Sequence, residues 1–134
     1  MTEPTMVNTT PHTVTLYVCK DIIVDYAADK ERQLRLAEQP GEDRGTAHGV
    51  PTRGPPQWTG LVPMSWGPSP FSDIDGPIDL LVSMPVGNYL AANGLPPGWR
   101  ERVHAVYGPD TGPAAVVRDD SGQIRGTRAL IRYA

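Results

Sequence analysis

The segment from residue 40 to residue 77 constrains the fold more than any other part of this chain. Its 38 residues contain eight prolines and seven glycines, so regular structure is expected there only in short pieces. Disordered linkers avoid large apolar side chains, whereas this segment contains Trp58, Leu61, Val62, Met64, Trp66 and Phe71. We therefore expect a long ordered loop that packs over a sheet, or an arm that binds a partner.

Short apolar runs on either side of this segment predict β-strands. Several of them are rich in β-branched residues, and one alternates leucines with charged side chains. A nearly continuous apolar run, which is typical of a central strand, follows the Pro/Gly-rich segment. The strands expected on this basis cover residues 13–19, 22–26, 31–38, 78–82 and 103–107.

A short helix and a hairpin are expected in the second half of the chain. The helix covers residues 83–94, where Ser83 can cap its start and Pro85 fits its first turn. The hairpin joins residues 114–118 to residues 123–133 through a connection that contains aspartates and a glycine. Both assignments depend on the turn and capping residues that bracket short apolar runs.

These elements predict one small domain over residues 1–134, of the α+β class and mainly β. We expect about six strands and one or two short helices, with residues 40–77 as the long loop or arm. A chain of 134 residues can bury a modest core. The residues expected in that core are Tyr17, Val18, Val24, Leu80, Leu81, Val82, Val106, Val116 and Ile131.

Charge and composition exclude several classes of function. The net charge is −3, so the basic excess of a general nucleic-acid binder is missing, and nucleic acid is an unlikely partner. From Gly98 onward, however, the chain has six arginines and only four acidic residues. The planar guanidinium of arginine suits phosphate and carboxylate groups. No apolar run is long enough to span a membrane and no signal peptide is visible, so we expect a protein of the cytoplasm.

Metal binding and catalysis have little support in the sequence. The single cysteine, Cys19, excludes an intrachain disulfide and is expected to be buried, and the three histidines are too widely spaced for a typical zinc site. No nucleophile elbow or phosphate-binding glycine loop occurs. Asp73, Asp75, Asp119 and Asp120 lie beside glycines, where aspartate usually bonds the backbone. We expect a protein without cofactor or metal, and a binding protein rather than an enzyme.

Three patches of the sequence resemble an uncharacterised family of small phage and actinobacterial proteins. Residues 8–12 are similar to its N-x-T-P-H start, and residues 78–83 to its strand before a short helix. Residues 109–126 resemble its closing pattern P-D-T-G-P…V-R-D-x-x-G-x-I-x-G. The resemblance covers about half of the chain and does not extend to residues 41–71. It implies a phage-type accessory protein and no particular activity.

A candidate site follows from these patches and from the arginines and tryptophans. In one interpretation the polar residues are structural: Asn8 bonds the backbone, and Asp110 pairs with Arg118 across the hairpin. In the other, arginines and turn N–H groups hold an anionic oxygen while a tryptophan stacks on a base or sugar. The candidate ligand-binding residues are Asn8, His12, Trp58, Trp66, Asp110, Thr111, Arg118, Arg125 and Arg128.

Three functions are compatible with these features. The first is binding of a small anionic or nucleotide-like ligand without catalysis, which in a phage-type protein would sequester an immune signal in the cytoplasm of the bacterial host. The second is a virion or assembly component, such as a capsid-decorating or connector subunit, in which the Pro/Gly-rich arm contacts neighbouring copies. The third is a small hydrolase that uses His12 and an aspartate. A homo-oligomer or a virion partner is expected, and a membrane is not.

Overall fold

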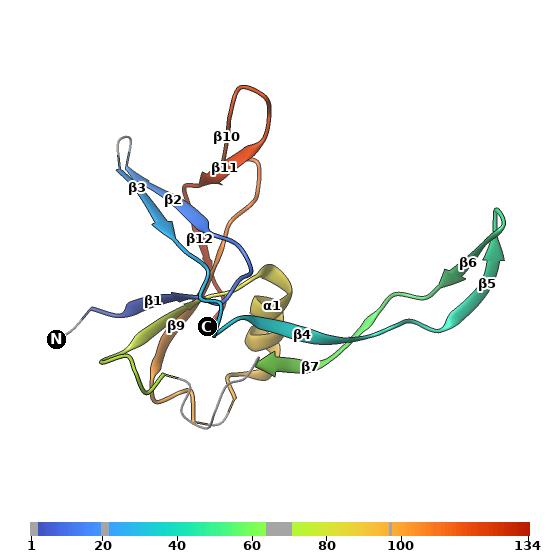
Figure 1. Cartoon of the computed structure of the whole chain (residues 1–134), viewed down its shortest axis with the longest axis horizontal. Coiled ribbons are helices and arrows are strands. Elements are labelled where there is room, and N and C mark those ends of the chain that lie inside the picture. The colour runs from blue at the N-terminus through green and yellow to red at the C-terminus, as the bar shows by residue number, and fades with distance from the viewer. Residues whose placement is uncertain (1–2, 20–21, 64–70, 97) are drawn as a thin grey trace.

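The computed structural model describes residues 3–19, 22–63, 71–96 and 98–134, and it confirms a mainly β fold (Figure 1). These residues form twelve strands and one short helix, in four sheets. The strand count is twice the expected one because the Pro/Gly-rich segment contains three strands, β1 was not expected, and the stretch at 123–133 is divided into two strands. The elements are β1 (Thr5–Asn8), β2 (Val14–Cys19), β3 (Ile22–Tyr26), β4 (Leu34–Gln39), β5 (Asp43–Ala47), β6 (Val50–Arg53), β7 (Gln57–Pro63), β8 (Ile78–Leu81), α1 (Met84–Asn93), β9 (Val103–Pro109), β10 (Val116–Arg118), β11 (Ile124–Thr127) and β12 (Leu130–Arg132).

The body of the molecule is built on a four-stranded sheet in the order β1-β8-β9-β12. β8 is parallel to both β1 and β9, and β12 is antiparallel to β9. The helix α1 connects the parallel strands β8 and β9, as in a βαβ unit. The strand predicted at 78–82 is therefore central, as its continuous apolar run indicates, and Leu80, Leu81 and Val82 are fully buried.

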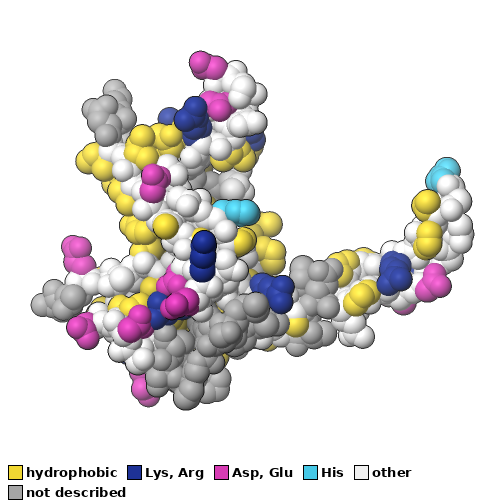
Figure 2. Space-filling model, in the orientation of Figure 1, with side chains coloured by type: hydrophobic (Ala, Val, Ile, Leu, Met, Phe, Trp, Pro, Cys, Tyr) yellow, Lys and Arg dark blue, Asp and Glu magenta, His cyan; other side chains and the backbone are white. Residues whose placement is uncertain are grey.

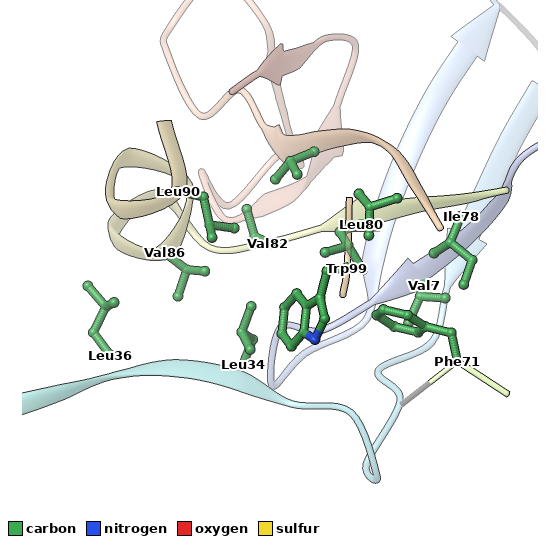
Figure 3. Packing of buried hydrophobic residues seen from close by; sticks show 12 residues of the cluster. Val7, Leu34, Leu36, Phe71, Ile78, Leu80, Val82, Val86, Leu90 and Trp99 are labelled. Carbon is green, nitrogen blue, oxygen red and sulfur yellow. The ribbon is translucent and has the colours of Figure 1, made fainter. Parts of the chain in front are cut away.

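The core lies where β8, β9 and α1 meet β4 and two aromatic residues (Figure 3). Leu34 and Leu36 project from β4 toward Val86 and Leu90 of the helix, because the alternation along β4 places both leucines on one face. Trp99 packs edge-on against Phe71, with ring centroids 5.8 Å apart. This contact fixes the segment before β8 to the turn before β9.

Arg102 holds the segment before β8 from the other side. Its guanidinium donates hydrogen bonds to the carbonyl oxygens of Phe71 at 3.0 Å and of Gly76 at 3.1 Å, and also to that of Ile74. An arginine has five donors in a fixed planar arrangement, so one side chain can satisfy several carbonyl groups of an irregular segment. The irregular backbone thus has hydrogen-bond partners without forming a strand.

The second four-stranded sheet, in the order β10-β11-β2-β3, stands away from the body (Figure 1). The hairpin predicted at 114–118 and 123–133 is present in its first part, but the chain then leaves for the body as β12. The prediction of a core position is wrong for two residues, since Val18 is 59% exposed and Ile131 is 38% exposed. The alternation of apolar residues along a strand does not show whether another layer of the protein covers that face of the sheet. Tyr17, Val24 and Val116 are half-buried.

The segment predicted as a long loop is partly an arm of two paired ribbons. β4 pairs with β7, and β5 pairs with β6 at the far end of the arm (Figure 1). Proline is compatible with this arrangement because a two-stranded ribbon has an unpaired edge on each strand, as at Pro51 in β6. The side chain of Trp58 and the whole of Trp66 lie outside the described residues, as does the side chain of Cys19.

Two glycines make room for the ring of Tyr133. A Cβ at Gly87, in the buried face of α1, would lie 2.3 Å from Tyr133 Cε2, and one at Gly108, in β9, would lie 2.7 Å from the same atom. Burial raises the pKa of the Tyr133 phenol, and the negative charge of Asp110 adds to the effect. Both glycines are therefore required by the packing of the Tyr133 ring. At Gly87 no other reason applies, since glycine has no conformational advantage inside a helix.

Substitution of Gly87 tests this packing. Alanine in a helix interior is normally favoured over glycine by about 0.8–1.0 kcal/mol. Because the new methyl group meets the Tyr133 ring, we expect Gly87→Ala instead to lower the free energy of unfolding by about 1–3 kcal/mol in urea denaturation. In a Tyr133→Ala background the same substitution should cost less. Equal effects in the two backgrounds would contradict the assignment.

Candidate functional site

A cleft of about 490 Å³ lies where the second sheet meets the body. One wall is residues 10–15, which comprise part of the connection from β1 to β2 and the first two residues of β2. The other walls come from β10 and β11 and from Ser83 and Met84 at the start of α1, together with the end of β9. This volume is in the range of small-molecule sites. The walls of the cleft come from both sheets.

The ionisable groups of the cleft are both basic. His12 and Arg125 line it, and no aspartate or glutamate does so among the residues described by the structure. Arg125 is the extra residue of a β-bulge, because Val117 lies opposite Gly126 whereas Arg118 lies opposite Ile124. A bulge redirects a side chain out of the regular alternation of a strand. Gly126, next to it, is needed because a Cβ there would lie 2.6 Å from the carbonyl oxygen of Thr15.

Asp119 orders the turn that carries Arg125. Its Oδ1 accepts hydrogen bonds from the Ser121 hydroxyl at 2.6 Å and from the backbone N–H groups of Ser121 at 2.9 Å and Gln123 at 3.0 Å. Arg125 Nε lies 3.6 Å from the other carboxylate oxygen. The bond from the Ser121 hydroxyl, followed by that from the Gln123 N–H, holds the pKa of Asp119 below its usual range. The Asp119 carboxylate thus uses its hydrogen bonds to hold the turn that precedes β11.

The start of α1 adds a second feature that favours anions. The first N–H groups of a helix have no partner within the helix and carry a partial positive charge. Pro85 in the first turn of α1 lacks an N–H, so Met84 and Val86 provide these groups. Ser83 is the N-cap residue, as predicted, but its side chain makes no capping hydrogen bond, so that part of the prediction is wrong. Both Ser83 and Met84 line the cleft, and the first turn of the helix contains no acidic residue.

Asn8 is a structural residue that positions one wall of the cleft. It is 2% exposed, and its Nδ2 donates to the carbonyl oxygens of His12 at 2.8 Å and Tyr26 at 2.7 Å. Its Oδ1 accepts from the backbone N–H of Thr10 at 3.0 Å and from the Thr10 hydroxyl at 2.6 Å. Every polar position of the amide is occupied, so Asn8 fixes the loop that carries His12 instead of contacting a ligand.

The remaining candidates lie in separate turns. Asp110 Oδ1 accepts a hydrogen bond from the Gly112 N–H at 2.9 Å, and Arg118 Nη1 donates to the Gly122 carbonyl at 2.7 Å. The alternative in which Asp110 pairs with Arg118 is therefore wrong. Arg118 and Arg128 do not line the cleft, whereas Thr111 does. Of the nine candidates, the structure brings together His12, Thr111 and Arg125.

Sequence reasoning did not include the apolar walls or the start of the helix in a site. Met84, Val116 and Ile124 line the cleft beside Ser83. A usable signal was present, because a continuous apolar run at residues 78–82, typical of a central parallel strand, is followed directly by the helix signals. Ligands in sheets with parallel strands commonly bind outside the carboxyl ends of those strands.

Comparison of the chain with protein-family models, with curated proteins and with solved structures finds no match. In the described parts of the chain, no group of three or more histidine, cysteine, aspartate or glutamate residues is placed to hold a metal ion. No helix within those parts is long and apolar enough to cross a membrane. The geometry of the cleft is therefore the basis for a functional proposal.

The role of Asn8 predicts a large loss of stability on an isosteric change. Asn8→Asp replaces the Nδ2 donor by an acceptor that faces the carbonyl oxygens of His12 and Tyr26. The Thr10 hydroxyl still reaches the His12 carbonyl, so the Tyr26 carbonyl loses the partner that it has in the side chain of Asn8. We expect the free energy of unfolding to fall by about 2–4 kcal/mol in urea denaturation followed by circular dichroism. The matched control is Asn88→Asp on the exposed side of α1, which should change it by less than about 0.5 kcal/mol. Similar losses in both variants would contradict the assignment.

The pKa of Asp119 predicts how the turn responds to acid. A lowered folded-state pKa means that the stabilisation is complete above the usual aspartate value of about 3.9 and is lost as the pH falls through the lower value. The amide resonances of Ser121 and Gln123, whose N–H groups bind the carboxylate, should therefore shift with a midpoint below about 3.9 in an NMR titration. Asp119→Asn should abolish this transition. A midpoint at or above the usual value would contradict the assignment.

Proposed function

We propose that this chain binds a small anionic, nucleotide-like ligand in the cleft and does not convert it chemically. The observation that carries the proposal is the charge of the cleft, which has Arg125 and His12 in its walls and no carboxylate among its described residues. The guanidinium is exposed, and its acidic neighbour among the described residues is Asp119, whose Oδ2 lies 3.6 Å from Arg125 Nε. Arginine in such a position can bind phosphate oxygens with two parallel hydrogen bonds.

The rest of the cleft supports a ligand with an apolar body as well as a charge. Met84, Val116 and Ile124 offer a surface against which a planar ring can pack. The start of α1 and the Ser83 hydroxyl lie in the same cleft and suit a phosphate group. The hydroxyl groups of Thr10 and Thr15 already donate within the protein, so the Thr13 hydroxyl in the β1–β2 connection is the better partner there for a sugar.

This proposal fits a phage-type protein that acts by sequestration. A protein that binds a signalling nucleotide of the bacterial host without turning it over would lower the free concentration of that signal in the host cytoplasm. Hydrolysis by His12 has less support, because no carboxylate that could orient the imidazole lines the cleft in the described residues. The paired His104 and Asp79, with Nδ1 and Oδ1 3.0 Å apart, belong to β9 and β8 and do not line the cleft.

The test uses isothermal titration calorimetry with nucleoside monophosphates, cyclic dinucleotides and inorganic pyrophosphate. We expect at least one nucleotide to bind, and Arg125→Gln to weaken its binding by about tenfold or more. The matched control is Arg128→Gln, an exposed arginine one residue beyond β11 that does not line the cleft. Its affinity should stay within about twofold of the unchanged protein.

Two results would overturn the proposal. One is the absence of binding to every compound of the panel, and the other is an equal loss of affinity in Arg125→Gln and Arg128→Gln. Binding of pyrophosphate with the same affinity as a nucleotide would show that only the phosphate is recognised. Release of a cleaved product would favour the hydrolase instead.

A role in virion assembly is a second candidate, favoured by the arm. The β5–β6 end of the arm projects far from the body (Figure 1), and every described residue of β5 is exposed. An isolated two-stranded ribbon is only marginally stable in water, so contacts with neighbouring subunits would stabilise it. Recovery of the protein only with assembled particles would favour this candidate over ligand binding.

A further inference from the structure

The strand β3 has an unpaired edge with apolar side chains on both faces. It is the last strand of its sheet, and β2 is its only paired neighbour in the part of the chain that the structure describes. Ile22 is 52% exposed and Ile23 is 56% exposed, and these consecutive side chains project from opposite faces of the strand. Figure 2 shows hydrophobic side chains gathered over β2 and β3.

Most of the features that normally prevent pairing with another strand are missing from β3. Such features are lysine, proline, a β-bulge that bends the edge away, or a covering loop. The ladder between β2 and β3 has one β-bulge, but its extra residue, Val18, belongs to β2. β3 has the sequence Ile-Ile-Val-Asp-Tyr and contains neither lysine nor proline. Its one charged residue, Asp25, accepts a hydrogen bond from the Thr15 hydroxyl of β2 at 2.6 Å. Its C-terminal carbonyl, that of Tyr26, is bonded by Asn8, so the open edge covers residues 22–25.

The arm provides the comparison, since it is equally exposed but its edges are protected. β5 contains a bulge, because Asp43 lies opposite Arg53 and Thr46 lies opposite Pro51. Pro51 in turn removes one N–H donor from β6. Both strands also carry an arginine. The chain therefore has means of protecting an exposed strand, and β3 lacks them.

We propose that β3 pairs with β3 of a second copy of this chain, antiparallel and related by a two-fold axis through Val24. A strand edge is recognised by the main-chain hydrogen bonds of another strand. In this register Ile22 lies opposite Tyr26 of the second copy, and Ile23 lies opposite Asp25. The two aspartates do not face each other, so the strand is complementary to itself in charge. The β10-β11-β2-β3 sheet of one copy and the same sheet of the second copy then form one sheet of eight strands.

The size of the contact sets the strength of the association. A pairing in which residues 22–25 of each copy supply the open edge makes a contact below the standard size of specific protein interfaces. We therefore expect a reversible dimer whose dissociation constant is on the order of 1–100 μM. No described residue of β3 lines the cleft, whose walls in this sheet come from β10, β11 and the start of β2, so dimerisation and ligand binding can be measured separately.

Sedimentation velocity over a range of protein concentrations tests the proposal. The unchanged protein should shift from monomer to dimer between about 1 and 500 μM. Ile23→Lys places a charge on the open edge and should shift the midpoint to a concentration at least tenfold higher. The matched control is Val50→Lys in β6, since Val50 is 58% exposed and Ile23 is 56% exposed. Its midpoint should equal that of the unchanged protein, and circular dichroism verifies that both variants are folded.

Disulfide formation then tests whether β3 is the strand that forms the dimer contact. In a Cys19→Ser background, a cysteine in place of Val24 lies next to its own copy across the two-fold axis, within the Cα separation of about 4.4–6.8 Å that a disulfide needs. Oxidation should give covalent dimers for Val24→Cys and none for Val50→Cys. A monomer at all concentrations, a dimer that Ile23→Lys does not weaken, or cross-linking through position 50 instead of 24 would each overturn the proposal.

Discussion

The fold depends on a buried group of polar residues at the end of β1, where three sheets meet. The N–H of Thr9 donates to the carbonyl of Leu81 in the body at 2.9 Å, and the carbonyl of Thr9 accepts from the N–H of Leu34 in β4 at the same distance. Asn8 reaches the carbonyl of Tyr26 in β3. Buried polar groups without partners are costly, and these groups satisfy one another only in this arrangement. The orientation of both the second sheet and the arm follows from that junction.

Much of the secondary structure could be predicted because its signals are local. β2, β3, β8 and α1 lie where the apolar runs and the turn residues place them. The arm could not be predicted in the same way. Its prolines and glycines are typical of a loop, and only pairing between β5 and β6 and between β4 and β7 converts them into a ribbon. Such pairing depends on partners that the pattern within one strand does not specify.

The candidate site shows a different limit. Asp110, Arg118 and Arg125 are polar residues near the same two turns, and the sequence treats them alike. What separates them is one extra residue in β11, which places Arg125 in the wall of the cleft while Arg118 bonds its own turn. Residue type was thus a useful guide to anion binding. The choice among similar residues required the register of the hairpin.

The order in which contacts can form follows from the same topology. The hairpins β2–β3, β5–β6 and β10–β11 join neighbouring segments, whereas β1 pairs with β8 across the whole arm. Closing a long loop costs more entropy than closing a hairpin, so we expect the central sheet to form after the hairpins. The walls of the cleft come from both sheets and are complete only after this step. A molecule bound there would therefore stabilise the folded state of the whole chain and not that of one hairpin alone.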